Sequence, residues 1–257
     1  MSTETKPDYN SVELLTTVAA KALDDESTVL VGTGMPQLAG MLAKETHAPD
    51  LTLIYEAGGI GADAPALPVT VGDERTIHEG VKAASMHDVM SYMQAGFVDY
   101  GFIGGAQIDR YGNLNSTVIG DWEDPTVRLP GSGGANDIGS LAHETMVVMR
   151  QDERKFVEEL DFCTTPGYLE GPGSREEHGL PRDSGPTNVI TQYGVYGFDE
   201  ETKEMTLEQL HPGVEESEVN ENSGFEIHVG DYERSPEPTE EELRLLREDL
   251  DPQGIIR

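Results

Sequence analysis

The feature that most limits the fold of this chain is the alternation of short apolar runs with segments of helical period over its first 150 residues. The apolar runs have the length of buried strands and lie at 28–31 (TVLV), 51–55 (LTLIY), 98–103 and 145–149. Segments with helical spacing lie between them at 11–23, 36–45 and 86–95, and a short helix is expected from about Asp137. Apolar strands that alternate with helices are typical of a mostly parallel sheet covered on both faces. The sequence therefore predicts an open α/β sheet.

The remainder of the chain has a different pattern. A loop at 166–186 contains five Gly and four Pro, which favours a loop that lines a site or a subunit interface over a flexible linker. Three short runs at 189–191, 195–198 and 205–210 predict a small antiparallel meander. Thr239 and Glu242 form a capping-box pattern for a last helix at about 239–250. We expect one domain over 1–257.

The charge of the chain excludes several classes of function. The chain contains 17 Lys and Arg but 49 Asp and Glu, which gives a formal charge of -32. Nucleic acid and anionic membranes are therefore not expected partners. No apolar run reaches membrane-spanning length, and the acidic first 25 residues do not resemble a signal peptide. The acids are dispersed, which favours a solvated coat suited to concentrated salt over an acidic tail for a basic partner. A high-salt cytoplasm is the predicted location.

Cysteine usage agrees with that location. The single cysteine, Cys163, excludes an internal disulfide and any multi-cysteine metal site, and no metal is expected. We expect Cys163 to be a small buried residue.

Glycine-rich loops follow predicted strands or precede predicted helices, at 32–34, 57–61 and 131–134, with Gly104–Gly105 as a possible fourth. Ligands of open parallel sheets bind beyond the carboxyl ends of the strands, and glycine lets backbone N–H groups approach a ligand. The loop at 32–34 is not a dinucleotide fingerprint, because Gln37 stands where its third glycine is required, and no phosphate-binding P-loop pattern occurs.

Glu56 differs from the other acidic residues in its position. It directly follows the apolar run LTLIY and precedes Gly58, Gly59 and Gly61. A carboxylate at such a strand end is a candidate nucleophile or base. The alternative is a structural carboxylate that accepts hydrogen bonds from the glycine amides, and spacing alone leaves both open.

Six runs, VGTGMP, YEAGG, FIGGAQIDRYGNLNST, GSGGAND, TTPGYLEGPGSREEHGLP and LHPGV, together resemble the beta subunit of family I coenzyme A transferases, particularly of the glutaconate type. The resemblance extends from about residue 10 to 252. It implies an open α/β sheet, an alpha subunit as partner, and acyl-CoA and a small carboxylic acid as substrates, with coenzyme A as substrate and no permanently bound cofactor.

The resemblance also implies roles for particular residues. Glu56 matches the glutamate that attacks the thioester and then carries CoA as a glutamyl thioester. Gly133, Gly134 and Ala135 are the first candidates for the oxyanion hole, whose donors are each worth roughly 2.7–4 kcal/mol in the transition state. The loop of Gly104 and Gly105, with Gln107, is a candidate contact of the acyl group or CoA, although Gln107 equally suits a bond within its own loop. Arg110 and Arg128 are candidate phosphate contacts, or else surface ion-pair residues.

Two alternatives remain at this point. Many family members have Ser or Asn after the catalytic glutamate, where this chain has Ala57. The related CoA-dependent hydrolases that open carbocyclic rings look similar there and in LHPGV, and in them the glutamate would activate water. The second alternative is a non-catalytic acidic subunit in which Glu56 is structural.

Overall fold

The centre of the protein is a sheet of five parallel strands. The computed structural model describes residues 8–256, and among these the largest sheet has ten strands in the order β14-β13-β12-β11-β10-β5-β1-β2-β3-β4. The parallel strands are β1 (Thr28–Val31), β2 (Thr52–Tyr55), β5 (Tyr100–Ile103), β10 (Glu144–Val148) and β11 (Gly185–Ile190). The predicted α/β sheet is confirmed, and its strand positions agree within two residues in these elements except β11, which starts four residues early.

The two edges of the sheet are formed by shorter or antiparallel strands. On one side the predicted meander consists of β11, β12 (Gly194–Phe198) and β13 (Met205–Leu210), followed by β14 (Glu233–Arg234). The meander therefore continues the main sheet, because β11 pairs with β10. On the other side, β3 (Gly59–Ile60) and β4 (Lys82–Ala83) pair antiparallel beyond β2.

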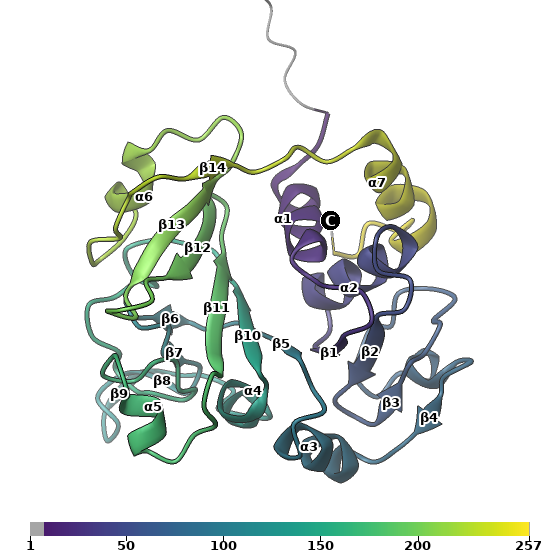
Figure 1. Ribbon diagram of the computed structural model, residues 1–257, viewed down its shortest axis with the longest axis horizontal. Helices are drawn as coiled ribbons and strands as arrows, with labels where there is room; N and C mark the ends of the chain where they lie inside the picture. The colour runs from purple at the N-terminus through teal and green to yellow at the C-terminus, as the bar shows by residue number, and fades with distance from the viewer. Residues whose placement is uncertain (1–7, 257) are drawn as a thin grey trace, which may run out of the picture.

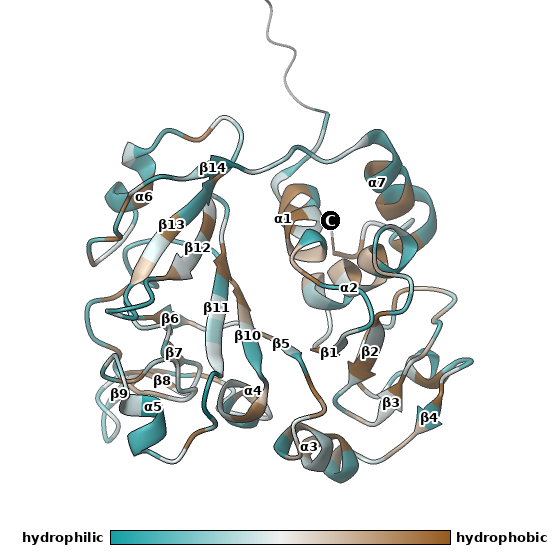
Figure 2. Ribbon diagram, viewed as in Figure 1, coloured by the Kyte–Doolittle hydropathy of each residue, from teal (hydrophilic) through white to brown (hydrophobic). Residues whose placement is uncertain are grey.

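Helices cover both faces of the parallel strands (Figure 1). On one face lie α1 (Ser11–Lys21), α2 (Met35–Glu45) and α7 (Glu240–Arg244), which continues as a π-helix over Leu245–Leu250. On the other face lie α3 (Met86–Gln94) and α4 (Ala135–Leu141). Successive side chains of β1 therefore face opposite sides of the sheet. Val29 and Val31 pack with the α1 and α2 residues, whereas Leu30 packs with α3 and α4. Figure 2 shows hydrophobic residues along β2, β10 and α1, whereas α5 (Ser174–Glu177) is hydrophilic.

Several elements were not predicted because they are too short to show a period. Two small hairpins, β6 (Gln107–Ile108) with β7 (Leu114–Asn115) and β8 (Val118–Gly120) with β9 (Pro125–Arg128), follow β5. The other unpredicted elements are β3, β4, β14, η1 (Glu74–Ile77), α5 and α6 (Ser217–Glu221). The expectation of a buried Cys163 is wrong. Cys163 is exposed because the segment around it runs along the surface beside these hairpins.

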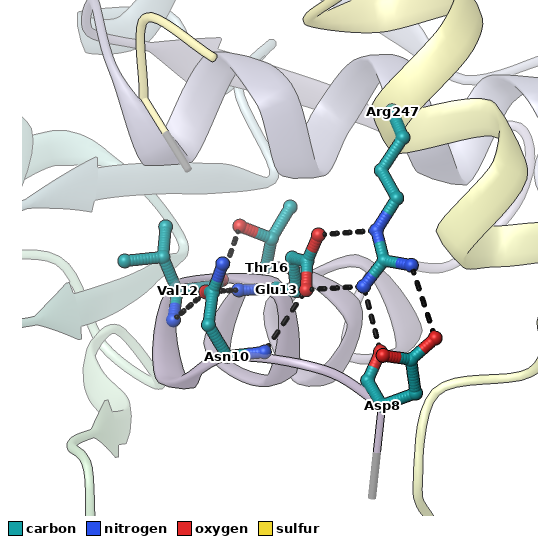
Figure 3. A network of polar contacts seen from close by, with 6 residues as sticks. All are labelled: Asp8, Asn10, Val12, Glu13, Thr16 and Arg247. Atoms are coloured by element: carbon teal, nitrogen blue, oxygen red, sulfur yellow. Dashed lines mark hydrogen bonds and ion pairs between the residues drawn. The ribbon is translucent and has the colours of Figure 1, made fainter.

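A polar network ties the start of α1 to the last helix (Figure 3). The Asn10 side chain accepts from the N–H groups of Val12 and Glu13, and Glu13 accepts from the Asn10 N–H at 2.9 Å, a capping box. Arg247 donates to both carboxylate oxygens of Glu13, at 2.7 and 2.9 Å, and to the Asp8 carbonyl. Because Glu13 is only 2% exposed, this pair is shielded from water on the carboxylate side.

No helix of residues 8–256 is both long and apolar enough to cross a membrane. The same residues contain no group of three or more His, Cys, Asp or Glu arranged to hold a metal ion.

Candidate active site

Glu56 stands at the carboxyl edge of the sheet, directly after β2. Tyr55 pairs with Val31 of β1, so Glu56 and Gly32 leave neighbouring strands side by side. The turn that follows requires glycine: Gly58 has φ +120°, its N–H donates to the Tyr55 carbonyl at 2.9 Å, and a Cβ there would lie 2.1 Å from the Ala84 carbonyl oxygen. This turn fixes the direction in which the chain leaves β2 and therefore the position of Glu56.

The side chain of Glu56 meets the glycine loop 131–134. Alternation along β2 predicts that Glu56 faces the same side as Ile54, towards α3 and α4. In agreement, a Cβ built on Gly134 would lie 2.9 Å from the Glu56 Oε1 atom and 3.2 Å from the methyl carbon of Met90. The structure thus brings together two residues that are 78 positions apart in the sequence. Met90 is half-buried beside them, and the helical pattern over 86–95 did not distinguish it as a site residue.

The contacts of Glu56 distinguish a catalytic carboxylate from a structural one. Its side chain is half-buried, and among residues 8–256 it forms no hydrogen bond or ion pair. A structural carboxylate at this place would accept hydrogen bonds from the glycine amides. Within the same described range, the N–H groups of Gly133 and Gly134 have no acceptor either, whereas the Ala135 N–H donates to the Ser132 carbonyl at 2.9 Å. The site therefore contains a free carboxylate next to two free backbone donors.

A cavity of about 440 Å³ lies at the same carboxyl edge of the sheet, at the ends of β1, β5 and β10. Glu56 is not among its lining residues, but Gly32, which leaves the neighbouring strand beside Glu56, is. Its walls combine glycine backbone with apolar side chains and one cation: Gly32, Met35, Pro36, Phe102, Gly104 and Arg150. Two of the predicted glycine loops, 32–34 and Gly104–Gly105, therefore border one cavity. Arg150, which has no distinguishing sequence signal, is the second residue after the end of β10.

Three other predicted site residues make contacts elsewhere. The Gln107 amide is buried and accepts from Asn115 at 2.7 Å, a bond within its own hairpin of the kind that the sequence left open. It also donates to Asp161 at 2.8 Å, which lies outside that hairpin. Arg110 pairs with two carboxylates, Glu158 and Glu204.

Arg128 likewise has a partner within its own hairpin. Its guanidinium donates to the Trp122 carbonyl and lies 4.4 Å from the Trp122 ring centroid. Arg110 and Arg128 thus have the surface contacts that were the alternative to phosphate binding, and phosphate contact by either stays a prediction.

The LHPGV segment has a structural role. His211 is fully buried, with Nδ1 2.8 Å from the Ser235 hydroxyl and Nε2 2.9 Å from the Thr191 carbonyl. Burial lowers the pKa of His211 to about 4. The imidazole therefore stays neutral and joins β13 to the neighbouring loops.

Comparison with known proteins places this geometry in a family. The family model of coenzyme A transferase matches residues 12–222. This chain belongs to the coenzyme A transferase family. The beta subunit of the 3-oxoadipate CoA-transferase of Pseudomonas knackmussii is 39% identical over 241 residues, which cover 93% of this chain and 92% of the relative.

A solved structure and a more distant relative complete the comparison. A chain of the crystal structure of glutaconate coenzyme A-transferase from Acidaminococcus fermentans superposes with a TM-score of 0.92 at 37% identity, covering 97% of this chain and 98% of the other. The cholesterol ring-cleaving hydrolase IpdB subunit of Rhodococcus jostii is 32% identical over 227 residues, 86% of this chain and 83% of the relative. The resemblance to a CoA-transferase beta subunit of the glutaconate and 3-oxoacid type is confirmed.

Proposed function

We propose that this chain is the catalytic beta subunit of a two-subunit CoA-transferase and that Glu56 is its nucleophile. The observation that carries the proposal is the Glu56 carboxylate, which has no partner among the described residues and lies against Gly134 at the carboxyl edge of the sheet. The similarity to the beta subunits of CoA-transferases supports the reaction class. The partner in this proposal is an alpha subunit, and the assembly works in a cytoplasm of high salt.

The proposed reaction uses only the carboxylate and the substrates. A Glu56 oxygen attacks the thioester carbonyl of acyl-CoA, the C–S bond breaks, and a mixed anhydride and the CoA thiolate form. The thiolate then attacks the Glu56 carbonyl carbon, the anhydride C–O bond breaks, and the acyl group leaves as a carboxylate. The acceptor acid reverses both steps on the glutamyl-CoA thioester, which regenerates Glu56.

The surroundings of Glu56 suit these steps. The free N–H groups of Gly133 and Gly134 are placed to stabilise the oxyanion of each tetrahedral intermediate. Half-burial removes part of the hydration shell of the nucleophile, and the cavity of about 440 Å³ at the carboxyl ends of β1, β5 and β10 offers an apolar wall to the substrate. We propose that this cavity binds the substrate and that Arg150 in its wall pairs with a negatively charged group of the substrate.

The test is the covalent intermediate. The co-expressed subunits are incubated with acyl-CoA and no acceptor acid, and intact-mass spectrometry is expected to find one CoA per beta chain, attached at Glu56. Glu56→Gln should abolish both the adduct and turnover. The matched control is Glu144→Gln, which alters another half-buried glutamate of the sheet, at the opposite edge, and should keep both. Full activity in Glu56→Gln would refute the proposal.

The same incubation distinguishes the hydrolase alternative. Two observations favour considering this second candidate: the residue after Glu56 is Ala57, and one relative is named as a ring-cleaving hydrolase subunit. A transferase without acceptor stops after one stoichiometric release of carboxylic acid. Continuous release of product from a ring-containing acyl-CoA, with no adduct, would instead assign the chain to the hydrolases.

A further inference from the structure

A second pocket, of about 250 Å³, lies where β10 and β11 begin, away from Glu56. Glu56 lies against Gly134 at the start of α4, whereas Arg175 of this pocket donates to the Gly139 carbonyl near the end of α4, at 3.1 Å. We call it the Arg175 pocket. Its polar lining consists mainly of His143, Tyr168, Arg175, Ser184, Thr187 and Lys203.

Arg175 is a buried cation whose hydrogen bonds all go to neutral groups. Its residue is 3% exposed, and its Nη atoms donate to the carbonyls of Pro166, Gly167 and Gly139 and to the Ser184 hydroxyl. Its Nε–H is buried and has no acceptor among the described residues. A buried charge is costly unless an opposite charge compensates it, so this arrangement lacks an anion.

Two further groups of the pocket lack a polar partner in the described range. The Thr187 hydroxyl is buried without a hydrogen bond, and the Lys203 amine forms no ion pair but lies 5.2 Å from the Tyr168 ring centroid. Lys203 has φ +58°, a conformation that non-glycine residues adopt at a cost. The two carboxylates in the lining, Glu176 and Asp183, both belong to exposed residues and neither forms an ion pair with these cations, although Glu176 attracts Arg175 electrostatically.

We propose that the Arg175 pocket binds a small oxyanion, a phosphate or carboxylate group. The Arg175 guanidinium and the Lys203 amine supply positive charge, and the Thr187 hydroxyl supplies a hydrogen bond, the combination that recognises such groups. A volume of about 250 Å³ admits an inorganic ion or a short carboxylic acid and is below the usual range of pockets for larger ligands. Because Glu56 is not part of this pocket, the proposal does not depend on the proposed function.

The experiment titrates the full chain, at constant chloride concentration, with inorganic phosphate and in parallel with malonate, and measures binding by calorimetry. We expect one site per chain for at least one of the two anions, and the stronger of the two identifies the group. Lys203→Asn, in which asparagine tolerates positive φ, should weaken binding about tenfold. Thr187→Val should weaken it several-fold without loss of thermal stability, because the variant removes an unsatisfied buried hydroxyl.

The control is Lys155→Asn, which removes a lysine paired with Asp152 on the surface, outside the pocket. It should bind like the unaltered chain. The proposal is overturned if neither anion binds, or if Lys203→Asn and Thr187→Val bind as tightly as Lys155→Asn. An equal rise of the melting temperature in all variants, without a saturable binding heat, would also overturn it, because that result is a general effect of salt.

Discussion

Replacing Gly134 by alanine should impair catalysis while leaving the fold intact. The new Cβ would lie 2.9 Å from Glu56 Oε1, whereas ordinary contacts begin near 3.4 Å, so the carboxylate must move by 3.4 − 2.9 = 0.5 Å. Gly134 has φ −80° and ψ −1°, which alanine adopts without strain. Since a misplacement of about 1 Å costs about 10²-fold in rate, half that distance predicts a loss of about tenfold in kcat.

The stability of Gly134→Ala should change in the opposite direction. Alanine restricts the unfolded chain and should raise the free energy of unfolding by about 0.4–1 kcal/mol where the native backbone accepts it. Kinetics of the assembled enzyme give kcat, and urea denaturation gives stability. Two glycines provide controls. Gly72→Ala, where a Cβ meets nothing within 4 Å, should keep kcat and gain stability by the same unfolded-chain effect, and Gly139→Ala, whose Cβ would lie 2.3 Å from Thr165, should lose stability. Unchanged kcat in Gly134→Ala would refute the placement of Glu56.

The remaining predictions concern stability. The pKa of His211 is about 4 in the folded chain and near 6.5 when unfolded, so unfolding takes up a proton between these values. Stability should be full above pH 6.5 and fall by about 3 kcal/mol towards pH 4, and urea titrations of His211→Gln should lack this slope. Arg247→Met removes the arginine that pairs with the buried Glu13 carboxylate and should lower the free energy of unfolding by about 2–3 kcal/mol. Arg244→Met removes only exposed ion pairs and should lower it by less than about 0.5 kcal/mol. Equal melting temperatures of the two variants would contradict a stabilising role of the Arg247 network. Because the charge is -32, the melting temperature should rise steeply between 0.1 and about 2 M KCl, and a flat profile would remove the high-salt interpretation.

Part of the site could be predicted from the sequence. An apolar run that ends in an acid and three glycines was enough to single out Glu56, because strand ends and tight turns leave local signals. Its contact with Gly134 was not predictable from spacing, since it depends on α4 packing over β5 beside β1 and β2. The family resemblance was needed to place that loop at Glu56.

The roles of other residues could not be predicted from the sequence, for one physical reason. Gln107 bonds to Asp161, 54 positions away, through hairpins whose strands are two residues long and have no readable period. The Arg175 pocket was likewise hidden, because the Gly- and Pro-rich segment 166–186 carries no periodicity. Arg175 holds it by hydrogen bonds to the Gly167 carbonyl in the same segment and to the Gly139 carbonyl of α4. Local pattern predicts elements, whereas such contacts are decided by packing.

The network in Figure 3 also has a consequence for synthesis of the chain on the ribosome. The layer of α1 and α2 is closed by Leu245, Leu246 and Leu250, and the start of α1 is held by Arg247. These contacts form only after more than 200 residues have followed α1 out of the exit tunnel. Until then, the part of this helical layer that the last helix covers stays exposed, and the nascent chain presents it to chaperones.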